Sequence, residues 1–446
     1  MLVANRGEIA IRVIRACRDL GISPVAVYSE ADRDALHVSL ADDAIEIGPA
    51  HATKSYLLPD AIVDAARNCG AEAVHPGYGF LSEDPRLPSA CEQAGITFVG
   101  PPADVMAAVG DKVQARAAAI AAGVPVVPGS DGRVQSAEHA HEVAETIGFP
   151  VMLKAAAGGG GRGIRVVETA DGLDDAYRTA ANEAAAAFGD GGLFIEKRLL
   201  RPRHVEVQVL ADSHGNVIHL GERDCSVQRR KQKLIEEAPA PGLDLAIRQQ
   251  LCQGAADFAR GVGYRGAGTC EFLVDRDGNV CFIEMNARIQ VEHGITELVT
   301  GVDLVAEQLR IASALTLDIE QSDVRLDGAA IEFRVNAEDP DNNFMPSPGA
   351  VTDWHVPGGP GVRIDTGFEN GSVVQPYYDS LVAKLMVWGR DRPQALARAR
   401  RALDEFQIDG ITTTLGLHRR LLEWDALVDG QVDTEALERR LEAQPA

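Results

Sequence analysis

An alternating segment between residues 280 and 292 constrains this chain more than any other feature of its sequence. From Glu284 onward every second residue of the segment is polar, in the order Glu284, Asn286, Arg288, Gln290, Glu292. Side chains of a strand point alternately to its two faces, so we interpret Val280 to Glu292 as one strand with an apolar and a polar face. A solvent-facing strand also alternates, but it usually carries Thr, Ser and Lys rather than carboxylates, amides and an arginine. The composition therefore favours a binding site.

The preceding segment predicts the partner of this strand. If Arg276 to Asn279 form a four-residue hairpin loop, Asp275 pairs with Val280, and Glu271 lies opposite Glu284. Such cross-strand neighbours are about 5 Å apart, and two like charges there are destabilising unless something neutralises them. A divalent cation or a shared proton with a raised pKa would do so. Oxygen ligands from Glu271, Glu284 and Asn286 favour Mg²⁺ or Mn²⁺ over zinc.

The N-terminus predicts a βαβ unit and hence an α/β fold. Leu2 to Asn5 and Pro24 to Tyr28 are typical of strands, and the periodic run Ile9 to Leu20 between them predicts an amphipathic helix. The first turn carries only Gly7 and lacks Gly-x-Gly-x-x-Gly, which argues against a nicotinamide oxidoreductase. Because the first strand is so short, we expect that a few residues precede Met1.

A glycine-rich run, Gly158 to Gly163, is suited to cradling phosphates, because backbone N–H groups can approach oxygens where no Cβ intervenes. It is not a Walker A motif, since no Gly-Lys-Ser/Thr follows. A flexible linker has the same composition, but Lys154, at the end of the predicted strand Phe149 to Lys154, adds a fixed positive charge. Lys112 is a weaker candidate and resembles a surface lysine.

Charge and cysteine content exclude several classes of protein. The formal net charge of −23 argues against nonspecific binding to nucleic acid or an anionic membrane. Against that background, the block Glu222 to Glu237 gathers arginines and lysines, as an anionic substrate requires. The seven cysteines include no Cys-x-x-Cys pair, so we expect reduced thiols and a cytoplasmic location. Cys225 has no identifiable His or Asn partner for a nucleophilic role.

Five motifs in order along the chain resemble the biotin carboxylases. They are His75 to Glu83, Lys154 to Gly163, Glu222 to Lys233, Glu284 to His293 and Arg334 to Pro340. The resemblance covers essentially the whole chain and implies an ATP-grasp fold of the α/β (α+β) class. It implies a Rossmann-like N-terminal domain at 1–110, a mobile lid at 126–199, a catalytic part at 200–310 and a C-terminal domain at 311–446.

The resemblance also implies roles for single residues. It places in the ATP site Lys112, Lys154, Gly160, Gly161, Glu196, Lys197, Leu199, His204, Gln228, Lys231, Leu273, Glu271 and Glu284. It assigns to the metal Glu271, Glu284 and Asn286, and to bicarbonate Lys233, Arg288, Gln290, Val291 and Glu292. Glu292 would be the base that deprotonates bicarbonate, and Arg334 would hold biotin. Lys233, Arg288, Glu292 and Arg334 form the implied catalytic set.

The implied reaction uses ATP, Mg²⁺ (or Mn²⁺) and bicarbonate to form carboxyphosphate, which breaks down to CO₂ and phosphate before biotin is carboxylated. No methionine neighbours a lysine, so we expect biotin on a separate carrier protein or domain, a carboxyltransferase as further partner, and a homodimer. The final acceptor stays open among acetyl-CoA, other acyl-CoA, pyruvate and urea. A carbamoyl-phosphate synthetase-like ligase shares the nucleotide and metal groups, and a noncatalytic nucleotide-binding subunit would usually lack a metal carboxylate or the base.

The chain departs from the family pattern in three places. Gly294 stands where proline is common, which predicts a less rigid catalytic loop. Lys231 stands where His or Asn is frequent, which puts one nucleotide contact in doubt. Ala156 and Ala157 replace Ser and Gly, a change that the lid should tolerate.

Overall fold

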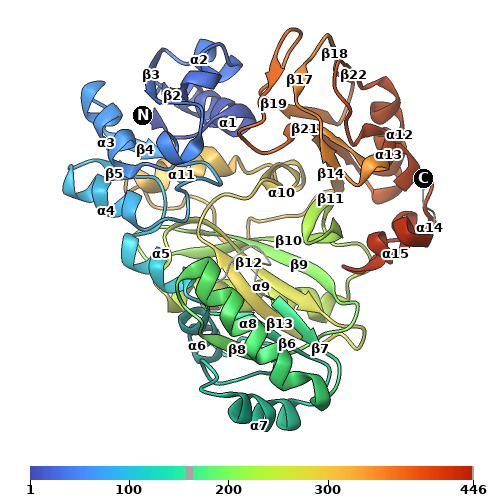
Figure 1. The fold of residues 1–446 in the computed structure, drawn as a ribbon. Helices are drawn as coiled ribbons and strands as arrows, with labels where there is room; N and C mark the ends of the chain where they lie inside the picture. The colour runs from blue at the N-terminus through green and yellow to red at the C-terminus, as the bar shows by residue number, and fades with distance from the viewer. Residues whose placement is uncertain (157–163, 444–446) are drawn as a thin grey trace.

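The computed structural model of this chain describes residues 1–156 and 164–443, and its N-terminal part is a parallel sheet covered by helices (Figure 1). The strand order is β3-β2-β1-β4-β5. The expected βαβ opening is confirmed, with a first strand of two residues. The strands are β1 Leu2–Val3, β2 Val25–Ser29, β3 Asp43–Gly48, β4 Ala73–His75 and β5 Thr97–Phe98. The helices are α1 Gly7–Asp19, α2 Leu36–Leu40, α3 Pro59–Asn68, α4 Arg86–Gln93 and α5 Ala103–Gly110.

The loop that follows β4 is held by the end of β1. Asn5 Nδ2 donates to the carbonyl oxygens of Pro76 and Tyr78, both at 2.7 Å. Gly77 adopts φ +62°, and a Cβ there would lie 2.8 Å from Asn5 Nδ2, so only glycine fits the turn. The His75 to Glu83 segment is therefore an ordered loop at the carboxyl end of the parallel sheet, as predicted.

A second sheet forms the lid, the part of the chain from α7 to β8 (Figure 1). Its three strands run in the order β7-β6-β8 and pack with two helices around a separate core that includes Leu153, Ala180 and Ile195. The predicted glycine-rich cradle lies between β6 and β7, largely outside the described residues. The elements of the lid are α7 Ala137–Ile147, β6 Val151–Ala155, β7 Ile164–Val167, α8 Leu173–Phe188 and β8 Leu193–Lys197. Helix α6 Lys112–Ala121 precedes the lid in the chain.

An eight-stranded antiparallel sheet dominates the rest of the chain, in the order β13-β12-β9-β10-β11-β14-β21-β19. It continues across residue 310, where we predicted a domain boundary, since β14, β19 and β21 follow that position. Its strands are β9 Arg203–Ala211, β10 Val217–Arg229, β11 Gln232–Ala238, β12 Gly266–Val274, β13 Val280–Asn286, β14 Ala329–Asn336, β19 Val362–Thr366 and β21 Leu381–Gly389. The helices that accompany it are α9 Leu245–Gly261, α10 His293–Thr300, α11 Leu304–Ala312, α12 Arg392–Glu405, α13 Leu415–Leu421, α14 Asp425–Val428 and α15 Ala436–Ala443.

Short elements complete the described chain. The small strands are β15 Glu338–Asp339, β16 Met345–Pro346, β17 Gly349–Ala350, β18 Asp353–His355, β20 Val373–Val374 and β22 Gln407–Asp409. The 3₁₀ turns are Glu30–Asp32, Ala52–Lys54, Ala170–Gly172 and Pro340–Asn342. Within the ranges that the structure describes, no helix is both long enough and apolar enough to cross a bilayer.

The strand predicted for residues 280–292 is only half correct. β13 ends at Asn286, and the chain then leaves the sheet as a loop that reaches α10 at His293. The predicted opposition of Glu271 and Glu284 is confirmed, although Val280 pairs with Val274 rather than Asp275. A bulge between Glu271 and Phe272 restores the register, because an extra residue on one strand shifts every later pair by one.

Gly294 lies in the first turn of α10, and its side of the helix is already filled. A Cβ at this position would lie 2.3 Å from Met386 Sδ, and Met386 is fully buried. The sulfur of Met386 thus occupies the space that a side chain at 294 would need. The glycine is explained by this packing, and the predicted loss of rigidity in the loop stays a prediction.

We expect Gly294→Ala to lower the free energy of unfolding by about 1–2 kcal/mol, because overpacking a filled core outweighs the gain in helix propensity. In a Met386→Ala background, the same substitution should cost nothing. Chemical denaturation of the four proteins of this double-mutant cycle measures the coupling. An equal cost of Gly294→Ala in both backgrounds would show that Met386 is not the cause.

Candidate active site

Glu271 and Glu284 occupy very different environments although they are cross-strand neighbours. Glu271 Oε1 accepts hydrogen bonds from Asn286 Nδ2 (3.0 Å) and Gln290 Nε2 (3.2 Å), and its Oε2 lies 3.0 Å from His204 Nε2. Burial would raise the pKa of Glu271, but Lys233 and His204 together hold it below the ordinary value. Burial and the charge of Glu271 raise the pKa of Glu284. Glu271 is therefore an anion, and Glu284 is the carboxylate that still needs a cation.

This donor set fits a hard divalent cation. The buried carboxylate of Glu271 faces the half-buried one of Glu284 across the strand pair, with the amide of Asn286 beside them. Asn286 Oδ1 accepts from Arg288 Nη2 at 2.8 Å, so the amide oxygen must turn to serve as a ligand. Oxygen ligands in this number leave positions for phosphate oxygens, as Mg²⁺ prefers.

Glu292 lies at the centre of a buried charge cluster. Its side chain is fully buried, and it is bonded by Lys233 Nζ (2.7 Å) and Arg334 Nη2 (2.9 Å). Burial alone would raise the pKa of Glu292, but Lys233 and Arg334 lower it well below its usual range. The carboxylate is thus ionised and directed at two cations that come from different strands, β11 and β14.

Two carboxylates next to this cluster, Glu206 and Glu236, were given no role by the sequence. Glu206 is fully buried and bonds both Lys233 Nζ and Arg223 Nε at 2.6 Å. Glu236 accepts from Arg334 Nε at 2.5 Å. Burial, opposed by Arg334, raises the pKa of Glu236 to about 7. A signal for Glu206 was present in the sequence. Polar residues alternate along 204–210, so that His204, Glu206 and Gln208 share one face of a strand.

Arg288 is fixed by the loop that follows β4. Its Nε donates to Glu83 at 3.0 Å, and its Nη1 donates to Gln290 Oε1 at 2.9 Å. Glu83 also accepts from the backbone N–H of Ala287 at 3.2 Å. The structure brings this loop into contact with the catalytic segment, by which we mean residues 287–292.

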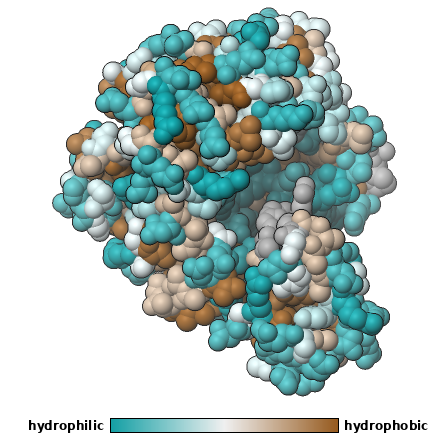
Figure 2. All heavy atoms as spheres, turned by 60° about the vertical axis from the view of Figure 1, so that its left-hand side comes forward, coloured by the Kyte–Doolittle hydropathy of each residue, from teal (hydrophilic) through white to brown (hydrophobic). Residues whose placement is uncertain are grey.

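The predicted phosphate-binding lysines converge on one cavity. Lys112, Lys154, Glu196 and Glu284 line it together, and Lys154 Nζ bonds Glu196. Burial lowers the pKa of Lys231, and the charges of Lys154 and Lys112 lower it further. Figure 2 shows one face of the molecule hollowed above the lid, with mostly hydrophilic residues around the hollow. Two ammonium groups that line this space, with that of Lys231 close enough to interact with both, suit a polyphosphate.

The remaining predicted nucleotide residues differ in how their side chains are used. Lys197 Nζ donates to the carbonyls of Gly148 and Phe149, at 2.9 and 2.8 Å, and therefore ties the lid together. Gln228, at the end of β10, is buried and pairs with Lys233 across the strands. Leu273 on β12 lies between His204 and Cys281, and Leu199 is half-buried after β8. Gly160 and Gly161 lie outside the described residues.

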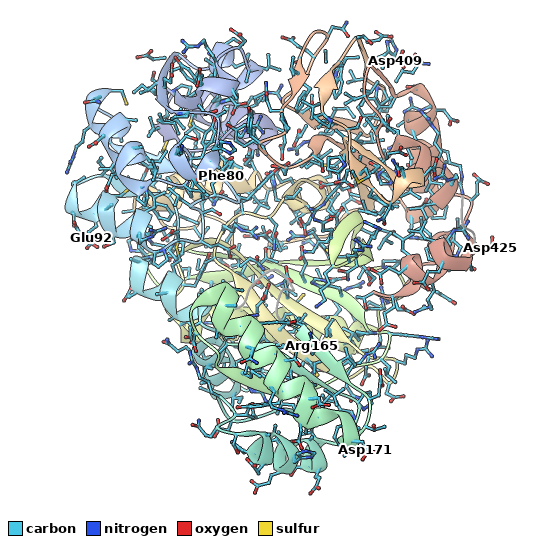
Figure 3. The ribbon with its side chains drawn as sticks, viewed as in Figure 1. Phe80, Glu92, Arg165, Asp171, Asp409 and Asp425 are labelled. Atoms are coloured by element: carbon cyan, nitrogen blue, oxygen red, sulfur yellow. The ribbon has the colours of Figure 1, made fainter. Side chains whose placement is uncertain are left out.

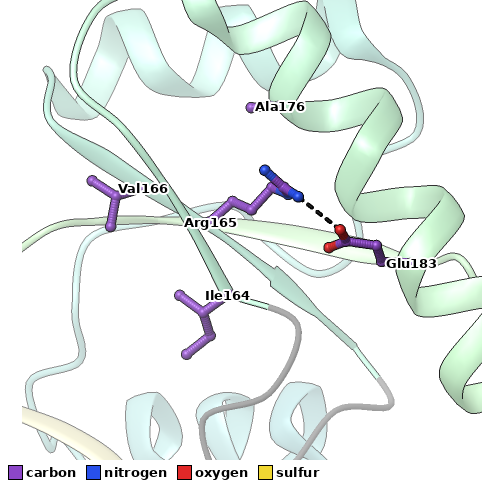
Figure 4. Close-up of a pocket in the computed structure, with 5 residues that line it drawn as sticks. All are labelled: Ile164, Arg165, Val166, Ala176 and Glu183. Carbon is purple, nitrogen blue, oxygen red and sulfur yellow. Dashed lines mark hydrogen bonds and ion pairs between the residues drawn. The ribbon is translucent and has the colours of Figure 1, made fainter. Parts of the chain in front are cut away.

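A separate pocket on the lid has a different character. Ile164, Val166 and Ala176 line it with the ion pair Arg165 Nη2 to Glu183 Oε1 at 2.7 Å (Figure 4). Figure 3 labels Arg165 on the lid and Phe80 in the N-terminal part. With a single partly exposed ion pair, this pocket offers no cluster of chemical groups.

Two residues of the Glu222 to Glu237 block do not provide positive charge for a substrate. Glu222 points to the opposite face of β10 from Arg223 and pairs with Arg248 Nε of α9 at 2.7 Å. Burial, opposed by Arg248, raises the pKa of Glu222. Cys225 is fully buried, with its Sγ 3.7 Å from Glu292 Oε1, and burial raises its pKa well above the ordinary value. A neutral thiol of this kind is no nucleophile, as expected from the sequence.

Fold and site together define an ATP-grasp enzyme, and comparisons with known proteins agree. Residues 1–106 match the N-terminal domain of biotin carboxylase, 111–320 the ATP-binding domain of the carbamoyl-phosphate synthase L chain, and 332–439 the biotin carboxylase C-terminal domain. The chain is 53% identical to biotin carboxylase 1 of Bacillus subtilis, covering 98% of each. It is 54% identical to biotin carboxylase of Pseudomonas aeruginosa, covering 99% of this chain and 98% of that one.

Solved structures show the same relationship. A Campylobacter jejuni biotin carboxylase in complex with a β,γ-ATP ligand superposes with a TM-score of 0.95 at 48% identity, covering 98% of both chains. The biotin carboxylase domain dimer of Hydrogenobacter thermophilus 2-oxoglutarate carboxylase, with MgADP, ADP and bicarbonate, gives 0.94 at 49% identity, covering 98% of this chain and 97% of that one. The chain belongs to the biotin carboxylase family.

The geometry predicts that Glu284→Gln stabilises the metal-free protein by up to about 1 kcal/mol, because it removes a like charge opposite Glu271. The same substitution should abolish the rise in melting temperature that Mg²⁺ gives the wild type. Thermal unfolding with EDTA and with added MgCl₂ measures both effects. A Glu284→Gln protein that Mg²⁺ stabilises as much as the wild type would contradict the assignment.

Proposed function

We propose that this chain uses ATP, Mg²⁺ and bicarbonate to carboxylate biotin, with the Lys233–Glu292–Arg334 cluster as the reaction centre. The observation that carries the proposal is a fully buried, ionised Glu292 held between two cations beside the metal carboxylates. The relative from Hydrogenobacter thermophilus was solved with MgADP and bicarbonate, which are the product and substrate expected here. A carbamoyl-phosphate synthetase-like reaction is disfavoured, since the match to that family covers only the ATP-binding region.

Each group has a distinct task in this scheme. Lys112, Lys154 and Lys231 hold the polyphosphate and stabilise charge on the transferring phosphoryl group. Mg²⁺ on Glu271, Glu284 and Asn286 would neutralise phosphate oxygens. Arg288 and Lys233 hold bicarbonate, and Glu292 removes its proton so that an oxygen attacks the γ-phosphorus and releases ADP. The resulting carboxyphosphate breaks down to CO₂ and phosphate.

Arg334 places biotin near the CO₂ that is released. It is already bonded to Glu292 and to Glu236, so a ureido oxygen bound to its guanidinium lies beside the base. Negative charge that develops on that oxygen is stabilised by the fixed cation. The ureido nitrogen gives up its proton to the phosphate that carboxyphosphate has released, attacks CO₂ and becomes carboxylated.

Biotin reaches this centre on a separate carrier protein or domain, and a carboxyltransferase then uses the carboxylated biotin. The relatives include a pyruvate carboxylase subunit from Methanothermobacter thermautotrophicus, 51% identical over 97% of this chain and 88% of that one. They also include the biotin carboxylase enzymes named above, so the final acceptor is set by the partner and not by this fold. A homodimer is proposed from the dimeric relative, and a cytoplasmic location stays a prediction.

We expect ATP hydrolysis by the wild type to require both bicarbonate and Mg²⁺ and to rise with free biotin. Glu292→Gln should lower this hydrolysis by at least about 100-fold, as expected for a lost general base. Binding of a nonhydrolysable ATP analogue, measured by calorimetry, should be retained. Glu307→Gln on α11, a buried carboxylate outside the cluster, is the matched control and should hydrolyse ATP like the wild type. Wild-type hydrolysis that ignores bicarbonate and biotin would refute the proposed function.

The charge cluster also predicts a pH effect of Arg334→Met. Arg334 lowers the pKa of Glu292, so removing its charge raises that pKa. The base works only when ionised, and activity is lost as pH falls through its pKa. The acid limb of bicarbonate-dependent ATP hydrolysis should therefore move to higher pH in Arg334→Met, at a fixed concentration of bicarbonate ion. An unmoved or downward-shifted limb would show that Arg334 does not control Glu292.

A further inference from the structure

A buried lysine next to the reaction centre has no role in the scheme above. Lys384 lies on β21, and its side chain is fully buried. Its cross-strand neighbours are Arg334 on β14 and Asp365 on β19. Cross-strand partners point to the same face of a sheet. Lys384 therefore faces α10 and the catalytic segment from beside Arg334.

The ammonium of Lys384 is bonded to the peptide group that precedes Glu292. Its Nζ donates to the carbonyl oxygen of Val291 at 2.8 Å. That carbonyl and the N–H of Glu292 belong to one planar peptide unit, so fixing the oxygen fixes the orientation of the backbone at Glu292. Lys384 thus acts on the residue that must point at bicarbonate, without touching the reacting atoms.

The charge of Lys384 is balanced by another part of the fold. Nζ lies 3.0 Å from Glu8 Oε1 on α1 and 3.9 Å from Asp365 Oδ2. Tyr78, in the loop after β4, donates to Glu8. The counter-charge of Lys384 is therefore supplied by the N-terminal part of the fold. Glu8 carries this charge, and Tyr78 is bonded to it.

Two further hydrogen bonds hold the catalytic segment on either side of Val291. His293 Nδ1 bonds the carbonyl of Gln290 at 2.8 Å, and Glu83 bonds the N–H of Ala287 at 3.2 Å. These contacts fix both ends of residues 287–292, and Lys384 fixes the peptide between them that leads into Glu292. A lost contact at that peptide would displace the base and the backbone at Val291 together.

We propose that Lys384 is a positioning residue that holds the Val291–Glu292 peptide in the geometry needed to bind and deprotonate bicarbonate. This inference rests on the proposed function. Displacement of a reacting group by about 1 Å can cost about 100-fold in rate. The effect should fall on bicarbonate and spare ATP, because among the described residues the contacts of Lys384 are with Val291, Glu8 and Asp365, none of which lines the nucleotide cavity of Lys112 and Lys154.

The test uses Lys384→Met, which keeps the aliphatic bulk and removes the ammonium. We expect KM for bicarbonate to rise at least about 10-fold and kcat to fall, with KM for ATP within about 2-fold of the wild type. A purely structural role would lower the active fraction and so kcat, without moving KM for bicarbonate. A bicarbonate KM that stays at the wild-type value, or that changes in step with the ATP KM, overturns the proposal.

Glu8→Gln and the double variant separate positioning from charge balance. Glu8→Gln leaves the bond from Lys384 to Val291 and should keep KM for bicarbonate within about 3-fold of the wild type. The double variant Glu8→Gln/Lys384→Met removes both buried charges, so it escapes the cost of an unpaired carboxylate. It should still show the raised bicarbonate KM. Recovery of the wild-type KM in the double variant would show that Lys384 only balances Glu8.

Circular dichroism and thermal unfolding show whether the variants fold. If Lys384→Met fails to fold, the double variant carries the test, and failure of both assigns Lys384 to the fold alone and overturns the proposal. Failure of the proposed function is distinct, because it appears in the wild type as hydrolysis that is indifferent to bicarbonate.

Discussion

The structure depends on keeping one ionised carboxylate, Glu292, completely out of water. An isolated carboxylate in such a place would take up a proton, because its desolvation costs several kcal/mol. Lys233 and Arg334 prevent this, and each is itself held by a second buried carboxylate, Glu206 and Glu236. Negatively and positively charged side chains alternate through the cluster. Removing any one member leaves its buried neighbours with fewer opposite charges.

This requirement explains why the large sheet is continuous. Lys233 comes from β11, Arg334 from β14, and Glu206 from β9, so the cluster forms only if strands far apart in sequence pair in the correct register. A register shift of one residue would turn each of these side chains to the opposite face. The sheet crosses the predicted boundary at residue 310 because the site needs strands from both sides of it.

The sequence predicted local features well and their environment poorly. The opposition of Glu271 and Glu284 was predicted because charge and hairpin length are local, yet it was correct only because an unseen bulge offset a turn assigned one residue too short. Alternation beyond Asn286 suggested a strand, but Arg288, Gln290 and Glu292 belong to a loop. An alternating pattern shows which residues are polar, but it does not show whether the backbone forms the hydrogen bonds of a strand. Glu206 and Lys384 look ordinary in the sequence because their burial depends on distant strands.

The nucleotide side of the site is coupled to the metal side through a short backbone contact. The segment that leads into the lid pairs with β13, since Phe282 N–H donates to the carbonyl of Pro125 at 2.7 Å. Phe282 lies two residues before Glu284 on β13, the strand that also carries Asn286. Lys154 and Glu196 on the lid share their cavity with Glu284. The position of Lys154 relative to Glu284 is therefore set at this strand, and a bound polyphosphate would bridge two parts of the fold that are already joined beside it.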